Sequence, residues 1–227
     1  MASTLRTDRG KKPVPPWQKI APRFTSEKDC LASFIAYETA EIIDRVKPGN
    51  LINLSDRCLP CGRNMFRSWK KYGPLLLSRT GLELKVLRTR EDNMLLFIFR
   101  RSDLQSLIER RPVRALLNKA GYPAGEDLDT VLGQLGSRMS ESCFPHEIGL
   151  FLGYPLKDVA AFMGLASLPF TCQGPWKIYG NPHKSLHLAG CHRSSRCRMA
   201  QRLSRTTCPQ MCLLRRPPGY SASIYAA

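Results

Sequence analysis

Hydrophobic and polar residues follow helical and strand periods through the middle of the chain. Apolar residues recur at helical spacing from about 26 to 46, and the sequence KPGN at 47–50 ends this helix, because proline and glycine continue a helix poorly. Similar spacing predicts helices over 62–73 and 126–139, the second with a strong apolar stripe.

The clearest strand signal lies at 82–100. The segment LELKVLR alternates, TREDN is a polar turn, and MLLFIFR is continuously apolar. This pattern predicts a β-hairpin whose second strand is buried on both faces. Shorter strands are expected at 51–54 and 176–180.

Two short helices are expected at 145–152 and 155–163, joined by Gly153 and Tyr154. Each has proline at its expected first position, where the missing N–H costs nothing. The fold class predicted is therefore α+β: a small, mainly antiparallel sheet with packed helices and a helical hairpin at 145–163.

Charge divides the chain into a domain and two ends. The net charge is +17, but residues 1–23 carry six basic residues and one acid, and residues 181–227 carry eight basic residues and no acid. We therefore expect a flexible, proline-rich basic arm at 1–24 and a single domain at 25–185. Residues 186–227 are rich in Cys, Arg and Ser without a lasting period, which predicts a disordered tail or out-of-frame translation of a GC-rich gene.

Targeting signals and cysteine usage point to the cytoplasm. The start of the chain has no apolar segment typical of a secretion signal, and the longest apolar run, Met94–Phe99, is too short to span a bilayer. Nine cysteines without a secretion signal favour free thiols in a reducing compartment. We expect a cytoplasmic protein with no membrane contact.

Two motifs could carry chemistry. Cys58-Leu-Pro-Cys61 could be a redox pair or half of a zinc site, but a second ligand pair is found only in the doubtful tail, so no metal site is predicted. Cys143 lies three residues before His146-Glu147, and a Cys–His nucleophile pair is conceivable.

The segment from Ile148 to Phe162 also has the spacing of small and apolar residues that is typical of a helix-turn-helix. Only Lys157 on its second helix could contact a phosphate, so a helical hairpin packed on the core is favoured. If the helix begins at Pro145, Glu147 lies in its first turn, where its negative charge meets the positive end of the helix dipole. This interaction alone could explain why a glutamate occupies the position.

FPHEIGLFLGYPLKDV at 144–159 and CQGPWKIYG at 172–180 resemble the bacterial family of unknown function 3793, as do KPGNLINL at 47–54 and LLFIFRRSDL at 95–104. The resemblance covers about residues 28–185. It implies no established activity, substrate or cofactor. Its motif positions, without assigned roles, are His146, Glu147, Gly149, Gly153, Tyr154, Cys172, Trp176, Lys177 and Tyr179.

The function expected from these observations is a ligand- or partner-binding module, with the cofactor unknown. The candidate binding residues are His146, Glu147, Tyr154, Cys172, Trp176, Lys177 and Tyr179. One alternative is an enzyme that uses His146, Glu147 and a cysteine, and convergence of His146, Glu147, Cys172 and Lys177 in one pocket would favour it. The other is nucleic-acid binding through the basic ends, which we expect to be at most weak and non-specific.

Overall fold

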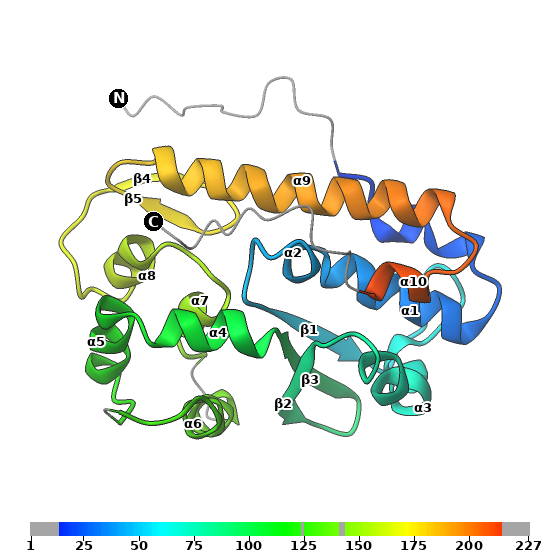
Figure 1. Cartoon of the computed structure of the whole chain (residues 1–227), viewed down its shortest axis with the longest axis horizontal. Helices are drawn as coiled ribbons and strands as arrows, with labels where there is room; N and C mark the ends of the chain where they lie inside the picture. Colours follow the sequence, from blue (N-terminus) through cyan, green and yellow to red (C-terminus); the bar gives the residue numbers. More distant parts are fainter. Residues whose placement is uncertain (1–13, 124, 141–143, 215–227) are drawn as a thin grey trace.

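A three-stranded antiparallel sheet lies at the centre of the molecule. The structure, a computed structural model, describes residues 14–123, 125–140 and 144–214 (Figure 1). The strands are β1 (Gly49–Ser55), β2 (Glu83–Thr89) and β3 (Asn93–Phe99), in the order β1-β3-β2. The predicted hairpin at 82–100 is confirmed as β2 and β3, and the strand at 51–54 as part of β1.

Strand β3 is buried on both faces because each face meets a different hydrophobic cluster. Leu96 and Ile98 point into one cluster, and Leu95, Phe97 and Phe99 point into the other. Alternate side chains of a strand point to opposite faces, so one continuously apolar strand serves both clusters.

The first cluster lies against the amino-terminal helices and the end of the chain. Its helices are α1 (Glu27–Glu38), α2 (Ala40–Ile43), α3 (Met65–Leu77), α9 (His183–Arg205) and α10 (Gln210–Leu213). The second cluster lies against the middle of the chain. Its helices are α4 (Arg101–Ile108), α5 (Arg111–Lys119), α6 (Leu128–Ser140), α7 (Ile148–Phe151) and α8 (Leu156–Phe162). These elements confirm the α+β class.

The boundaries expected for the flexible arm are wrong for residues 14–24. Two 3₁₀ turns, Trp17–Lys19 and Ala21–Arg23, place Trp17 and Phe24 in the first cluster. The indole Nε1 of Trp17 donates a hydrogen bond to Ser33 Oγ at 3.0 Å. Residues 1–13 lie outside the described residues.

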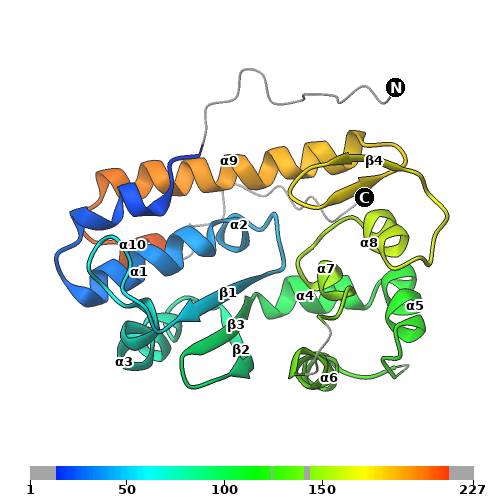
Figure 2. The same cartoon turned by 180° about the vertical axis from the view of Figure 1, so that it is seen from behind.

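The expected disorder after residue 185 is wrong for residues 186–214. Helix α9 runs along one edge of the molecule, from the hairpin of β4 (Phe170–Gln173) and β5 (Lys177–Tyr179) to α1 and α10 (Figure 2). Its inward side chains Met199 and Leu203 are buried in the first cluster, and so are two residues of α10, Cys212 and Leu213. The rest of the predicted tail, 215–227, lies outside the described residues.

The helical hairpin predicted at 145–163 is present as α7 and α8. Gly153, between them, has φ +71, a backbone conformation that glycine adopts at little cost. A Cβ on Gly149 would lie 2.9 Å from Val159 Cγ2, so the glycine allows the two helices to pack closely. No described helix is both long enough and apolar enough to cross a bilayer.

Candidate functional site

The segment that leads into β1 buries a lysine. Lys47 is only 6% exposed, and its Nζ donates a hydrogen bond to Asn50 Oδ1 at 2.6 Å. The Asn50 amide in turn donates to the main-chain oxygen of Glu38 at 2.7 Å. The KPGN sequence therefore does more than end a helix: it fixes a cation beside the end of α1.

Helix α9 supplies an arginine to the same region. Arg196 Nε donates to Glu41 Oε1 at 2.6 Å, and its Nη2 donates to Glu38 Oε2 at 3.4 Å. The guanidinium lies 5.4 Å from the centre of the Tyr37 ring. One turn earlier on α9, His192 lies on the same side of the helix and is buried.

Two aromatic rings complete the site. Tyr154 stacks on Trp176 with ring centres 4.6 Å apart, and Trp176 lies 5.9 Å from the ring of His192. Lys47 Nζ lies 5.9 Å from the centre of the Tyr154 ring. We refer to the six polar residues as the polar cluster: Glu38, Glu41, Lys47, Asn50, His192 and Arg196.

Asp158 holds the aromatic side of the site in place. Its buried carboxylate accepts hydrogen bonds from Lys157 Nζ at 2.6 Å, Trp176 Nε1 at 2.9 Å and Ser185 Oγ at 2.6 Å. It also accepts one from the main-chain N–H of Tyr179 at 3.0 Å. These bonds join α8, β5 and α9, so one carboxylate fixes Trp176 against the polar cluster.

Two acceptors of the polar cluster are buried without a hydrogen-bond partner in the described part of the chain, namely Glu41 Oε2 and His192 Nε2. His192 uses its other ring nitrogen to bond the main chain of Val46, so the neutral ring presents Nε2 as an acceptor. Buried polar groups without a partner are rare in folded proteins because each costs about 1–3 kcal/mol.

Burial shifts the titration of the basic groups. It lowers the pKa of Lys47 to about 8, against the opposing effect of the Glu41 carboxylate. Burial also lowers the pKa of His192 to about 4, and the charge of Lys47 acts in the same direction. At neutral pH the polar cluster therefore holds a charged lysine beside a neutral histidine.

The predicted site residues separate into three places. Tyr154 and Trp176 face the polar cluster, as described above. Glu147 points away, into the second cluster: its Oε1 accepts hydrogen bonds from Tyr122 Oη at 3.2 Å and Arg138 Nη1 at 3.0 Å. Cys172 lies on the inner face of the β4–β5 hairpin, where it packs with Ile178 of β5 and Leu188 of α9.

His146, Lys177 and Tyr179 lie at the surface. The His146 ring is 4.8 Å from the centre of the Phe162 ring, and Lys177 Nζ is 5.3 Å from it. Tyr179 contacts Phe170. Among the described residues, the side chains of His146 and Lys177 meet at Phe162, whereas the Glu147 carboxylate bonds Tyr122 and Arg138, so these groups do not converge as the enzyme alternative requires. Cys143 lies outside the described residues.

The start of the helical hairpin differs from the prediction. Helix α7 begins at Ile148, with Glu147 as its N-cap, whereas Pro145 and His146 form the turn before it. Glu147 makes no side-chain cap; its carboxylate turns inward to Arg138 because a charge in the core requires a partner.

The second helix of the hairpin is covered on two sides. Helix α8 packs against α5 and β5, and Lys157 is engaged by Asp158 and by the main-chain oxygen of Tyr179. A recognition helix needs an exposed face with free side chains, so this geometry does not support the helix-turn-helix alternative.

The thiols of the CxxC motif lie in a turn after β1, with Cys58 exposed and Cys61 half-buried beside Cys30. Burial raises the pKa of the Cys30 thiol to about 11, which makes it a poor nucleophile. Within residues 14–123, 125–140 and 144–214, no three His, Cys, Asp or Glu side chains are grouped as metal ligands.

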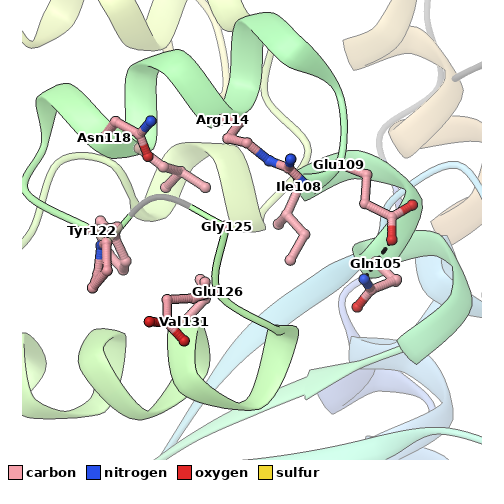
Figure 3. Close-up of a pocket in the computed structure, with 11 residues that line it drawn as sticks. Gln105, Ile108, Glu109, Arg114, Asn118, Tyr122, Gly125, Glu126 and Val131 are labelled. Atoms are coloured by element: carbon pink, nitrogen blue, oxygen red, sulfur yellow. Dashed lines mark hydrogen bonds between the residues drawn. The ribbon is translucent and has the colours of Figure 1, made fainter.

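Two hollows lie away from these residues. One, of about 20 Å³, lies between α4, α5 and the segment that leads into α6, with Arg114, Tyr122 and Glu126 in its lining (Figure 3). It has room for about one water molecule. The other, of about 260 Å³, lies between α3 and α10, and four leucines and Met211 share its lining with polar residues such as Lys28 and Arg79. Neither includes a predicted site residue.

The helices and antiparallel strands make this a small α+β protein, and the polar cluster is its candidate binding site. Its sequence matches the family described as Protein of unknown function (DUF3793) over residues 35–212, most of the chain. The protein therefore belongs to this family. The match continues to residue 212, within the segment expected to be out of frame. No curated protein and no solved structure is similar enough to count as a match.

The sequence pattern did not indicate four residues of the site: Glu41, Asp158, His192 and Arg196. Glu41 and Asp158 lie on predicted helices, and nothing local distinguishes them from solvated charges. His192 and Arg196 lie in the supposed tail. One signal was present: Asp158 is the last acidic residue of the chain, so every later cation must find its partner earlier in the sequence.

Proposed function

We propose that the protein is a ligand-binding module and that its ligand is a small zwitterion held at the polar cluster. The observation that carries this proposal is the pair of buried acceptors without partners, Glu41 Oε2 and His192 Nε2, in the field of a buried lysine. A ligand that donates hydrogen bonds to both would remove the cost of burying them.

The charges of the polar cluster select the kind of ligand. By formal charge, Glu38 and Glu41 contribute two negative charges and Lys47 and Arg196 two positive charges, so the formal charge of the cluster is zero. A ligand without net charge preserves this balance. An ammonium group suits Glu41 Oε2, and a carboxylate suits the N–H groups of Lys47 that Asn50 does not use.

The aromatic side adds an apolar surface. Tyr154 and Trp176 present stacked rings beside Lys47, and such rings bind aliphatic or planar groups while Asp158 keeps them in place. The ligand class that these charges and rings favour is an amino acid or a similar compact molecule with an amine, a carboxylate and a modest apolar part.

The test is a thermal-shift screen of amino acids and related amines at millimolar concentration. A ligand at 100 times its dissociation constant stabilises the folded protein by about 2.7 kcal/mol, which is readily detected. We expect at least one zwitterion to raise the melting temperature, and neither its amide nor its N-acetyl derivative to do so.

Glu41→Gln is the matched variant. Its amide oxygen can still accept from Arg196, but an N–H donor replaces the free Oε2, so the fold should persist and binding should fall by at least about tenfold. Glu126→Gln, at an exposed position, is the control. The proposal fails if no zwitterion shifts the wild type, or if Glu41→Gln responds equally.

The cellular setting is a further part of the proposal. The eight cysteines within the described residues are free thiols, which supports a reducing compartment. We propose the cytoplasm of a bacterium, the origin that the sequence resemblance implies.

A further inference from the structure

The hollow of about 260 Å³ between α3 and α10 lies at the end of α9 opposite the β4–β5 hairpin (Figure 1). Its floor is apolar, because Leu76 and Leu213 belong to the first cluster. Higher on its walls, Leu75 of α3 is 51% exposed and Met211 of α10 is 58% exposed. These two side chains line one hollow instead of being scattered singly over the surface, so they leave apolar area that a ligand can cover.

Among the described residues, two cations and no acidic residue line this hollow. Lys28 comes from α1, and Arg79 follows the end of α3. Neither side chain makes an ion pair or a hydrogen bond within the described part of the chain. Asp29, next to Lys28 in the sequence, accepts a hydrogen bond from Gln210 Nε2 at 3.1 Å and so joins α1 to α10. The lining therefore complements an anion.

The volume of the hollow limits the size of that anion. A water molecule occupies about 30 Å³ in the liquid, so the hollow has room for about nine non-hydrogen atoms. This is enough for a short acyl chain with its carboxylate, and too little for a phospholipid or a sterol. Met211 is unbranched and flexible, which allows its wall to adapt to such a chain.

We propose that this hollow is a second binding site, and that its ligand is a medium-chain fatty acid of about eight carbons. Lys28 and Arg79 bind the carboxylate, since the planar guanidinium can donate two parallel hydrogen bonds to it. The acyl chain covers Leu75 and Met211 and removes their apolar surface from water. The hollow shares no residue with the polar cluster, so this proposal is independent of the zwitterion site.

Cys208 reports the occupancy of the hollow, because this exposed thiol is part of its lining. Cys58 is also exposed but lies in the turn after β1, and it serves as the internal control. Alkylation of the full-length protein with iodoacetamide, followed by peptide mass spectrometry, measures both thiols at once. Octanoate at about ten times its dissociation constant should slow the reaction of Cys208 about tenfold and leave Cys58 unchanged, since only the free protein exposes the Cys208 thiol.

Two related compounds separate the charge of the ligand from its chain. Octanamide keeps the chain without the charge, and acetate keeps the charge without the chain. Each should bind at least about tenfold more weakly than octanoate, and so at the same concentration should slow the reaction of Cys208 by no more than about twofold.

Two protein variants locate the site. Arg79→Gln removes one cation at an exposed position, and Leu214→Trp fills the hollow from its lining. Each should reduce the protection by octanoate to about twofold or less, whereas Arg90→Gln, at an exposed position after β2, should retain it.

The proposal is overturned if octanoate does not protect Cys208, if octanamide protects it equally, or if Arg79→Gln is protected as well as the wild type. Protection of Cys208 that follows the protein concentration instead of octanoate would also overturn it, and would identify a second copy of the chain as the occupant of the hollow.

Discussion

His192 is neutral in the folded protein because it is buried beside Lys47, which lowers its pKa to about 4. In the unfolded chain its pKa is near 6.5. Between these two values the unfolded state binds more protons, so this histidine makes the fold less stable as the pH falls from about 6.5 to 4.

His192→Gln should remove this part of the pH dependence. Urea unfolding at pH 7 and pH 4.5 should show a smaller loss of stability on acidification in the variant than in the wild type. His183→Gln, at an exposed position on the same helix, should retain the wild-type loss. An unchanged pH dependence in His192→Gln would show that the histidine is not buried in its neutral form.

Asp158 should be a large single contributor to stability. Burial opposes its ionisation, but hydrogen bonds from Lys157, Ser185 and others lower its pKa below the usual value. Its contribution is therefore present above the pKa of the unfolded chain and is lost as the pH falls through the folded pKa.

Asp158→Asn should cost about 2–4 kcal/mol at pH 7, since the amide replaces one acceptor oxygen by a donor that faces other donors. Denaturant unfolding measures this loss, and Asp92→Asn in the exposed β2–β3 turn is the control. A loss below about 1 kcal/mol would mean that water can accept the same hydrogen bonds, and that Asp158 is not a large contributor to stability.

Single residues were the hardest feature to predict from the sequence. The resemblance singled out Glu147, but its partners Tyr122 and Arg138 are 25 and 9 residues away, and no local pattern joins them. Tyr154 and Trp176 were predicted as motif positions and lie beside the polar cluster, whereas Lys47, which lies over the Tyr154 ring, was interpreted only as part of a helix stop. Whether these residues bind a ligand stays a prediction.

At the scale of elements, local periodicity predicted those helices and strands whose buried side chains are all apolar. The β2–β3 hairpin and α6 each show a clear strand or helix period in their apolar residues, and both are present as predicted. Helix α9 was missed because its inward positions are half polar. The buried residues of α9 recur at helical spacing, but polar and apolar side chains are mixed among them: Ser185, Leu188, His192, Ser195, Met199 and Leu203. The polar members are buried only because the rest of the molecule supplies their partners.

Leu203→Ala tests whether α9 is part of the core. Leu203 is fully buried in the first cluster, so the substitution should cost about 2–5 kcal/mol. Ser204→Ala, exposed at the next position, should change stability by less than about 0.5 kcal/mol. Equal unfolding midpoints for the two variants would mean that this segment is not packed in the core and that the predicted disorder is correct for it.

At the scale of the whole molecule, ion pairs engage part of the positive charge of the described residues. Arg45 pairs with Asp103, Arg198 with Asp44, and Arg101 with both Glu83 and Asp129. The net charge of +17 already subtracts these acidic residues, and most of it comes from residues 1–23 and 181–227 rather than from the segment between them.

Binding to duplex DNA should accordingly be weak, independent of sequence, and lost as salt rises from about 50 to 200 mM. Anisotropy with two unrelated labelled duplexes at several salt concentrations measures this. A clear preference for one duplex that persists at 200 mM would instead establish a nucleic-acid-binding function.

The most direct test of the ligand-binding proposal is a high-resolution crystal structure of the protein with the amino acid that gives the largest thermal shift. We expect continuous ligand density that joins Lys47 Nζ to Glu41 Oε2, with the apolar part of the ligand against Tyr154. Ordered water molecules bonded to Glu41 Oε2 and His192 Nε2, with no ligand density beside them, would contradict the proposal and make the polar cluster a purely structural network.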